Sequence, residues 1–570
     1  MPGFYISTHF YSNKVDNYYN NTCIKNEIKN SKYIIKRNTL NKFLDDKVFC
    51  ENDKYIVIIE GVILNKSEII SNYSSGNFFN SIISMFENKG EDFFKDFKGS
   101  FSGAFHNKTT DEWIIFTNQI GDNQVFYYYE GGNFIVGSEV NYIVETLNKE
   151  NVNYNVDEQA IYSLLTYSFV IDDRTVINEI KRIDAGSYIK ISPYHFRKKI
   201  YFELTTNKYN LQDLAMDDLV DKLDEMYVDA VRLEYLKDRE YNYQHLVELS
   251  GGLDSRMNLW VAHELGFNNI LAITYSKSGY LDARIAEKIA LKLQKNWFFK
   301  SLDDPNIIYD IDENIRMNFG LNGYFNVTKS NAAYKILNFN NIGICHTGQL
   351  GDVIVSSYLK TTIDARPHKF NFAESTKLID RLDVSFLEQY DSEEMFAMNV
   401  RGFRGILNSH LIRKNYFETT SPFLDIDFLE FCMSIPLKYR LNHKLYKYWL
   451  KKKYPAACQF VWEKTGLRVN ANDFEIFLRR LVSRGPDKLK RMMGIKVKAK
   501  ANTMNPYDFW YHNNIEIKKF MDEYFEKEID EYEITDMLRK DMRFLYNCGS
   551  AFEKSQVLTV LSALKLYFKR

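Results

Sequence analysis

The sequence predicts two successive domains, an antiparallel α+β domain followed by an α/β domain that is built on a parallel sheet. Residues 1–205 alternate short β-like runs with turns, and one helical pattern interrupts them. Residues 206–570 instead alternate apolar strand-like runs with amphipathic helical patterns, which is typical of a parallel sheet. A chain of 570 residues is long enough to give each domain its own core.

The elements of the first domain are short and rich in aromatic and β-branched residues. The helical pattern covers Phe78–Glu87. The predicted strands are Tyr33–Ile35, Tyr55–Leu64, Trp113–Phe116, Val125–Tyr129, Phe134–Gly137 and Ser187–Ile191.

The second domain is organised around the run from Leu246 to Gly266, which reads as a strand, a Ser-Gly-Gly turn and a helix. Glycines let the main chain approach a polyphosphate, and a helix N-terminus offers free N–H groups and a positive dipole end. Serine hydroxyls add donors, and Asp254 can hold a magnesium ion. We therefore predict a nucleotide-binding loop made of Leu249, Ser250, Gly251, Gly252, Leu253, Asp254 and Ser255.

A second strand and helix follow this loop, at Ile270–Tyr275 and Leu281–Leu293. Ligands of parallel sheets bind beyond the carboxyl ends of the strands. We therefore expect Ile273, Thr274 and Tyr275 to lie near the adenine of a bound nucleotide.

The sequence Ser-Gly-Gly-Leu-Asp-Ser at 250–255 resembles the pyrophosphate loop of the ATP-pyrophosphatase superfamily, whose members cleave ATP between its α and β phosphates. The resemblance implies a Rossmann-like parallel sheet of the HUP type with a helical tail, and ATP as a substrate. The alternative is a Gly-Gly turn that merely precedes a helix, since glycines commonly serve turns.

A further glycine-rich turn, within Ile342–Ile354, resembles the Ser-Gly-Glu-Gly-x-Asp-Glu loop of the asparagine synthetases. The resemblance implies that Gly348 contacts ATP and that Asp352 joins Asp254 in holding Mg²⁺. Gln349 stands in place of the family's glutamate, and Val353 in place of a second acid. A glutamine can position a substrate by hydrogen bonding but cannot accept a proton.

Another group must then deprotonate the attacking amine, or catalysis is impaired. Tyr324 and Tyr358 are candidates for this role. His346 is a third, although a single histidine at the end of a strand is more often structural.

Lys464 lies in Trp462–Leu467, which matches the Lys-x-Gly-Phe element of the same family. The resemblance implies that Lys464 stabilises charge on the α-phosphate, whereas a solvated lysine is the alternative. Basic residues around 488–491 and 496–500 form a solvated surface or a patch for an acidic substrate.

The first domain looks like the glutaminase half of the glutamine-dependent asparagine synthetases, through Glu60–Asn65, Phe97–Phe105 and Gly121–Glu139. This implies an αββα sandwich like that of Ntn hydrolases. The related glutaminases use a cysteine at the position of Pro2, and Asn118 replaces an arginine that binds the glutamine carboxylate. We therefore expect no release of ammonia from glutamine, and a structural role for Gly61 and Asn65.

Composition narrows the partners and the compartment. A net charge of −1 gives no general attraction to nucleic acid or membranes, and the six cysteines contain no C-x-x-C pair. The N-terminus lacks a basic leader with an apolar core, and the run Tyr55–Leu64 is too short to span a bilayer. We expect a cytoplasmic protein that binds neither nucleic acid nor membranes.

Together these features predict an asparagine synthetase-like ATP-dependent carbon–nitrogen ligase. It would adenylate a small-molecule or peptide carboxylate, release pyrophosphate and use an amine that does not come from glutamine. β-Lactam synthetases and lasso-peptide cyclases share this architecture, so a role in natural-product or polysaccharide biosynthesis is favoured. A homodimer or a biosynthetic partner protein remains open.

Two other functions are left as alternatives. One is a catalytically silent relative that binds nucleotide or serves as a scaffold, which Pro2, Gln349 and Val353 make plausible. The other is a tRNA-modifying enzyme of the same superfamily, against which the neutral charge and the absence of zinc-binding cysteine pairs argue.

Overall fold

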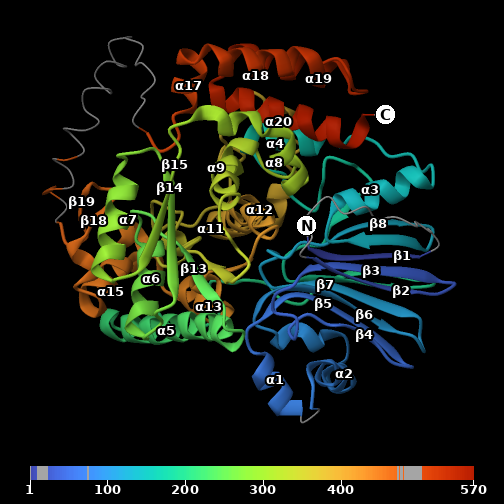
Figure 1. Cartoon of the computed structure of the whole chain (residues 1–570), viewed down its shortest axis with the longest axis horizontal. Coiled ribbons are helices and arrows are strands. Elements are labelled where there is room, and N and C mark those ends of the chain that lie inside the picture. The colour runs from blue at the N-terminus through green and yellow to red at the C-terminus, as the bar shows by residue number, and fades with distance from the viewer. Residues whose placement is uncertain are drawn as a thin grey trace.

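The computed structural model describes residues 2–8, 23–73, 76–471, 474–475, 479 and 503–569. An amino-terminal sandwich of two antiparallel sheets lies beside a carboxyl-terminal domain with a parallel sheet and many helices (Figure 1). This arrangement confirms the fold class that the sequence predicts.

Each sheet of the sandwich has six strands, in the orders β10-β8-β9-β1-β3-β2 and β12-β11-β7-β6-β5-β4. Helices α1 (Lys66–Tyr73) and α2 (Phe78–Lys89) cover one outer face, and α3 (Val140–Lys149) covers the other (Figure 1). The strands are β1 (Gly3–Thr8), β2 (Cys23–Lys29), β3 (Tyr33–Leu40), β4 (Phe49–Glu51), β5 (Tyr55–Ile63), β6 (Gly99–Asn107), β7 (Glu112–Thr117), β8 (Phe126–Glu130), β9 (Asn133–Gly137), β10 (Lys181–Arg182), β11 (Ser187–Ser192) and β12 (His195–Ile200).

Strand β5 shows why the sandwich has four layers. Ile56 and Ile58 point into the core between the two sheets, whereas Val57 and Ile59 pack in the core under α1 and α2. Successive side chains of a strand point to opposite faces, so a continuously apolar strand requires a cover on both sides.

Six strands of the sandwich were not among those predicted from the sequence: β1, β2, β4, β6, β10 and β12. Serine, threonine or glycine interrupts the apolar pattern of β1 and β6. In β6 a Cβ on Gly103 would lie 2.4 Å from the Ile58 carbonyl oxygen, so glycine is needed for close packing against β5.

The carboxyl-terminal domain contains a five-stranded sheet in the order β15-β14-β13-β16-β17, in which all neighbouring strands are parallel. Strand β13 lies at the centre, and the chain adds strands to one side of it and then to the other. The strands are β13 (Gln244–Glu248), β14 (Ile270–Ser276), β15 (Asn296–Ser301), β16 (Ile342–His346) and β17 (Glu418–Thr420). Loops that follow β13 and β16 therefore meet at the point where the strand order reverses, which is where such sheets bind ligands.

Helices surround this sheet, and a helical layer extends beyond it (Figure 1). The apolar core of this layer is continuous with residues of the sandwich and of α3. Helix α20 is buried over most of its length, and a capping box of Ser550 and Glu553 fixes its start. The helices discussed below are α4 (Glu158–Tyr167), α5 (Met216–Glu240), α6 (Asp254–Glu264), α7 (Leu281–Lys292), α8 (Ile311–Asn318), α9 (Tyr324–Tyr334), α10 (Gly351–Ile354), α12 (His410–Arg413), α15 (Lys444–Lys453), α17 (Tyr507–Asn513) and α20 (Ala551–Phe568).

The predicted basic stretches at 488–491 and 496–500 lie outside the described residues. Among the residues that are described, no helix has the length and apolar character needed to cross a bilayer.

Candidate active site

The loop between β13 and α6 is closed by its own side chains. Ser250 N donates to Ser255 Oγ (3.0 Å) and Gly252 N donates to Ser250 Oγ (3.1 Å). Gly251 N donates to Asp282 Oδ1 (2.6 Å), at the start of α7. The N–H groups of the loop thus donate to oxygen atoms of the protein. A phosphate bound at the helix N-terminus would offer oxygen acceptors of the same kind.

A cavity of about 220 Å³, here called the phosphate-loop cavity, opens above this loop. Nine of the eleven residues predicted to contact ATP line it, together with Gln349 and Asp282. Its lining is Glu248, Leu249, Ser250, Gly252, Asp254, Ser255, Ile273, Thr274, Tyr275, Asp282, Gly348, Gln349 and Met504.

Gly251 and Leu253 are the two predicted contacts that do not line this cavity. A Cβ on Gly251 would lie 2.7 Å from Asp282 Oδ1 and 2.9 Å from Glu463 Cβ, so this glycine makes room for protein atoms. The Leu253 side chain is buried in the core under the sheet. Of the two glycines, only Gly252 lines the cavity, and a contact between Gly251 and a polyphosphate stays a prediction.

The two carboxylates predicted to hold magnesium lie side by side. Asp254 is buried and accepts a hydrogen bond from the Tyr446 hydroxyl (2.8 Å), and Asp352 begins the neighbouring helix α10. Burial and the charge of Asp352 raise the pKa of Asp254 well above its usual range. Two adjacent carboxylates that oppose each other's ionisation suit a hard divalent cation, so these residues fit Mg²⁺.

Lys464 lies close to this pair of carboxylates. Its Nζ lies 3.7 Å from Asp352 Oδ2 and 2.9 Å from His443 Nε2. Burial and the Lys464 charge lower the pKa of His443 to about 4, so its imidazole is neutral and accepts the lysine N–H. The other ring nitrogen meets Ser356 Oγ (2.8 Å), which fixes the imidazole and aims the lysine.

A second cavity, of about 280 Å³, adjoins the first, because Tyr275 and Gln349 line both. We call it the side cavity. Part of its wall is a π-helix, Ala397–Ile406, a form that often occurs at functional sites. Its lining is Tyr167, Phe169, Tyr275, Asn322, Asn326, Lys329, Ser330, Gln349, Glu374, Arg401, Gly405, Ile406, Ser409 and Arg413.

Both ends of the Gln349 amide are engaged with the start of α12. The amide nitrogen donates to Ser409 Oγ (2.8 Å), and the amide oxygen contacts His410 Nε2. Arg413 donates to the same Ser409 hydroxyl (2.8 Å) and to Glu248 Oε2 (2.7 Å). Gln349 therefore ties its loop to α12, the helix that forms one wall of the side cavity.

The opposite face of this segment is held by the amino-terminal sandwich. Gln124 donates to Asn408 Oδ1 (2.6 Å), and Asp122 Oδ2 lies 3.2 Å from His410 Nδ1. Lys414 Nζ donates to the Asp122 carbonyl oxygen (2.8 Å). Residues four apart share a helix face, so His410 and Lys414 contact the sandwich while Ser409 and Arg413 line the side cavity. The contacts with the sandwich therefore fix the wall of the side cavity.

Tyr324 and Tyr358 are the two tyrosines predicted to replace the missing glutamate, and neither lines the two cavities. Tyr324 is fully buried in the helical core, where it contacts Phe325 and its main-chain N–H donates to Thr559 (3.1 Å). It lines neither cavity, and this placement argues against its predicted role. Tyr358 follows α10 and packs on Phe372, and burial raises the pKa of its phenol.

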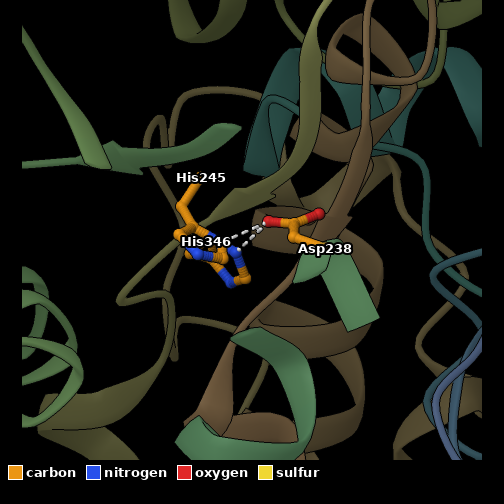
Figure 2. Close-up of side chains that lie close together, drawn as sticks. All are labelled: Asp238, His245 and His346. Atoms are coloured by element: carbon orange, nitrogen blue, oxygen red, sulfur yellow. Dashed lines mark hydrogen bonds and ion pairs between the residues drawn. The ribbon is translucent and has the colours of Figure 1, made fainter. Parts of the chain in front are cut away.

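His346 is part of a buried polar network and not of the cavity. Figure 2 shows His245 and His346 meeting the same carboxylate, Asp238, at 2.8 and 2.9 Å. The other ring nitrogen of His346 lies 3.1 Å from Glu234. Although burial opposes it, bonding to these two carboxylates raises the pKa of His346 to about 9.

A protonated His346 has no lone pair for a metal ion or a substrate proton, although Asp238, His245 and His346 lie close enough to suggest a metal site. The Ile344 N–H occupies the remaining oxygen of Asp238 (2.8 Å). The geometry therefore supports a structural role for His346 and not a role as a base.

The predicted remnants of a glutaminase site are internally bonded. Asn118 donates to Asp122 Oδ1 (2.7 Å) and to the Gly99 carbonyl oxygen (3.1 Å). Asn65 donates to the Asp96 carbonyl oxygen (2.9 Å) and accepts from Lys98 N (3.0 Å). Both side chains hold turns of the sandwich, which is consistent with a structural role.

Several residues of the site were not predicted from the sequence. Lys329, Arg401 and Arg413 line the side cavity, and His443 and Tyr446 contact Lys464 and Asp254. None lies in a short motif with the phosphate loop, and each arrives from a helix or turn distant in the chain. The three arginines at positions 401, 404 and 413 were the one available signal.

Two family models match the chain. One describes a glutamine amidotransferase domain and covers residues 46–202, and the other describes asparagine synthase and covers residues 408–454. The second match begins at the segment that the sandwich holds and that lines the side cavity.

Two curated proteins are similar to part of the chain. A putative glutamine-hydrolysing asparagine synthetase 2 of Methanocaldococcus jannaschii is 22% identical over 284 residues, 46% of this chain and 53% of that protein. The glutamine-hydrolysing asparagine synthetase 2 of Bacillus subtilis is 23% identical over 288 residues, 46% of this chain and 35% of that protein. The chain thus matches about half the length of the first relative and about a third of the second.

Among solved structures, a glutamine phosphoribosylpyrophosphate amidotransferase from B. subtilis aligns with 53% of this chain and 85% of its own, at 8% identity and a TM-score of 0.24. A likeness this weak adds nothing to the strand orders described above.

Proposed function

Starting from an asparagine synthetase-like chain, as both family matches and both relatives support, we propose that the protein is an ATP-dependent amide-forming ligase. A substrate carboxylate attacks the α-phosphate of ATP and pyrophosphate leaves. An amine then attacks the acyl carbon and AMP leaves. The observation that carries this proposal is the shared wall of the two cavities, since Tyr275 and Gln349 border both the phosphate loop and the side cavity.

The residues of the phosphate-loop cavity have distinct roles in this scheme. Ser250, Gly252 and Ser255 bind the phosphate oxygens through N–H and hydroxyl groups. Asp254 and Asp352 hold Mg²⁺, which neutralises phosphate charge when it is bound. Lys464, aimed by His443, stabilises the charge that develops on the α-phosphate.

The amine comes from free ammonia, from a second substrate or from another group of the same molecule. Both relatives are named as glutamine-hydrolysing enzymes, whereas this chain has Pro2 and Asn118 at two positions that glutamine chemistry uses. We therefore assign the ligase to a cytoplasmic biosynthetic route for a natural product or polysaccharide, acting on small-molecule or peptide substrates.

Exchange of radiolabelled pyrophosphate into ATP, measured with a panel of carboxylic acids, tests this proposal. We expect exchange that depends on the acid and on Mg²⁺, and that is lost in an Asp254→Asn variant. Release of ADP and orthophosphate instead of AMP would overturn the proposal. Nucleotide binding without exchange for any acid would favour a catalytically silent protein.

A further inference from the structure

The second half of the proposed reaction needs a proton acceptor. When a neutral amine attacks the acyl carbon, its nitrogen becomes positively charged and must lose a proton before AMP can leave productively. Gln349 cannot take this proton, and Ser409 and His410 already engage both ends of its amide.

The two candidate tyrosines and the two histidines described above do not supply this function. Tyr324 lies outside both cavities, and the raised pKa of Tyr358 keeps its phenol protonated. His346 is held protonated between two carboxylates, and His410 faces Asp122 on one side and Gln349 on the other.

Lys329 is different, because its ammonium or amine group is free. It projects from α9 and lines the side cavity together with Tyr275 and Gln349. Within the described part of the chain its side chain forms no hydrogen bond or ion pair, in contrast to Arg413 in the same wall.

The carboxylates nearest to Lys329 already have partners. Asp282 accepts from Gly251 N (2.6 Å). Glu248 accepts from Arg413 (2.7 Å) and from the Tyr275 hydroxyl (3.0 Å). Lys329 is therefore available to a molecule that occupies the side cavity.

We propose that the Lys329 amine is the general base of the amide-forming step, which rests on the proposed ligase function. As the carbon–nitrogen bond forms, the attacking amine gives one proton to Lys329 Nζ. The bond between the acyl carbon and the phosphate oxygen breaks, and its electron pair leaves with AMP. Lys329 thereby becomes an ammonium, which returns the proton to solvent when the amide is released.

The surroundings of Lys329 favour its neutral form. Burial lowers the pKa of Lys329, and the positive charge of Arg413 acts in the same direction, while Asp282 and Glu248 oppose them. Arg401 and Glu374 face the same cavity and form an ion pair with each other (3.5 Å). A lysine whose pKa is lowered in this way is a better base at a given pH than an exposed lysine.

Two substitutions separate a base from a charge that merely binds substrate. Lys329→Met removes both properties, whereas Lys329→Arg carries a positive charge but cannot act as a base at neutral pH. With an acid that supports pyrophosphate exchange, we expect both variants to retain exchange within about threefold and to lose about 10²-fold or more in amide formation. The matched control is Lys335→Met, near the end of the same helix, where the lysine pairs with Asp310 and Glu313 outside the cavity.

Restored amide formation in Lys329→Arg would overturn the proposal, and so would an equal loss of exchange and amide formation in Lys329→Met. A substrate-independent measurement is competitive acetylation of the intact wild-type chain with acetic anhydride from about pH 6 to about pH 10, followed by peptide mass spectrometry. We expect Lys329 to gain reactivity at lower pH than the pooled exposed lysines, and titration together with them would refute the assignment. Absent exchange with every acid would refute the ligase instead, so the two failures are distinguishable.

Discussion

Replacing Lys464 with methionine should damage catalysis far more than folding. Its side chain is 50% exposed and its partner Asp352 is 44% exposed, so the ion pair at 3.7 Å contributes about 0–1 kcal/mol to stability. In the proposed reaction the same ammonium faces charge that develops on the α-phosphate. Losing one such preorganised donor typically costs about 10²–10³ in rate, or about 3–4 kcal/mol.

The assay compares pyrophosphate exchange and thermal unfolding for the wild type and Lys464→Met, with an acid that the wild type accepts. Lys451→Met is the matched control, since Lys451 is an exposed lysine on the nearby helix α15. We expect exchange to fall about 100-fold in Lys464→Met with little change in unfolding temperature, and no effect in the control. Exchange within about threefold of wild type, or a loss that tracks destabilisation, would refute the assigned role.

Three further outcomes are expected. In Gly348→Ala the new Cβ would lie 2.4 Å from Ser255 N, a backbone atom, so ATP affinity measured by calorimetry should fall about tenfold or more; unchanged affinity would contradict the packing of the two loops. The pKa of His346 is about 9 in the folded protein against about 6.5 unfolded, so its stabilisation is complete below about pH 6.5 and is lost as pH rises through about 9. Unfolding temperatures should therefore decline over that window by the equivalent of about 3 kcal/mol, and a His346→Gln variant should lack this component. Because Pro2 provides no nucleophile, glutamine should release no ammonia above background in a coupled assay, and measurable release would show that another group cleaves it.

Much of the fold and part of the site follow from local sequence patterns. The run Leu246 to Gly266 contains its own strand, turn and helix signals, so β13, the loop and α6 could be predicted together. Asp254, Asp352 and Lys464 come from three separate motifs, and the structure brings them to one place.

The residues that could not be predicted depend on contacts between distant segments. Lys329 occupies an ordinary helical position, and only the packing of α9 against the sheet directs it to the side cavity. Gly251 has the sequence context of a phosphate contact, yet Asp282 and Glu463 take the space beside it. Tyr324 is a residue whose hydroxyl suggested a place in the site. The structure instead buries it where α9 packs against α20.

The hydrogen bonds between the sandwich and residues 408–414 predict what happens when the chain is shortened. Cutting after β12 would remove the hydrogen-bond partners that the sandwich provides to Asn408, His410 and Lys414, and each buried polar atom left unsatisfied costs about 1–3 kcal/mol. The carboxyl-terminal half produced alone would then lose the shape of the side cavity, and adding the sandwich as a separate polypeptide should restore it. The amino-terminal sandwich would thus be needed for the shape of its neighbour, independently of any chemistry of its own.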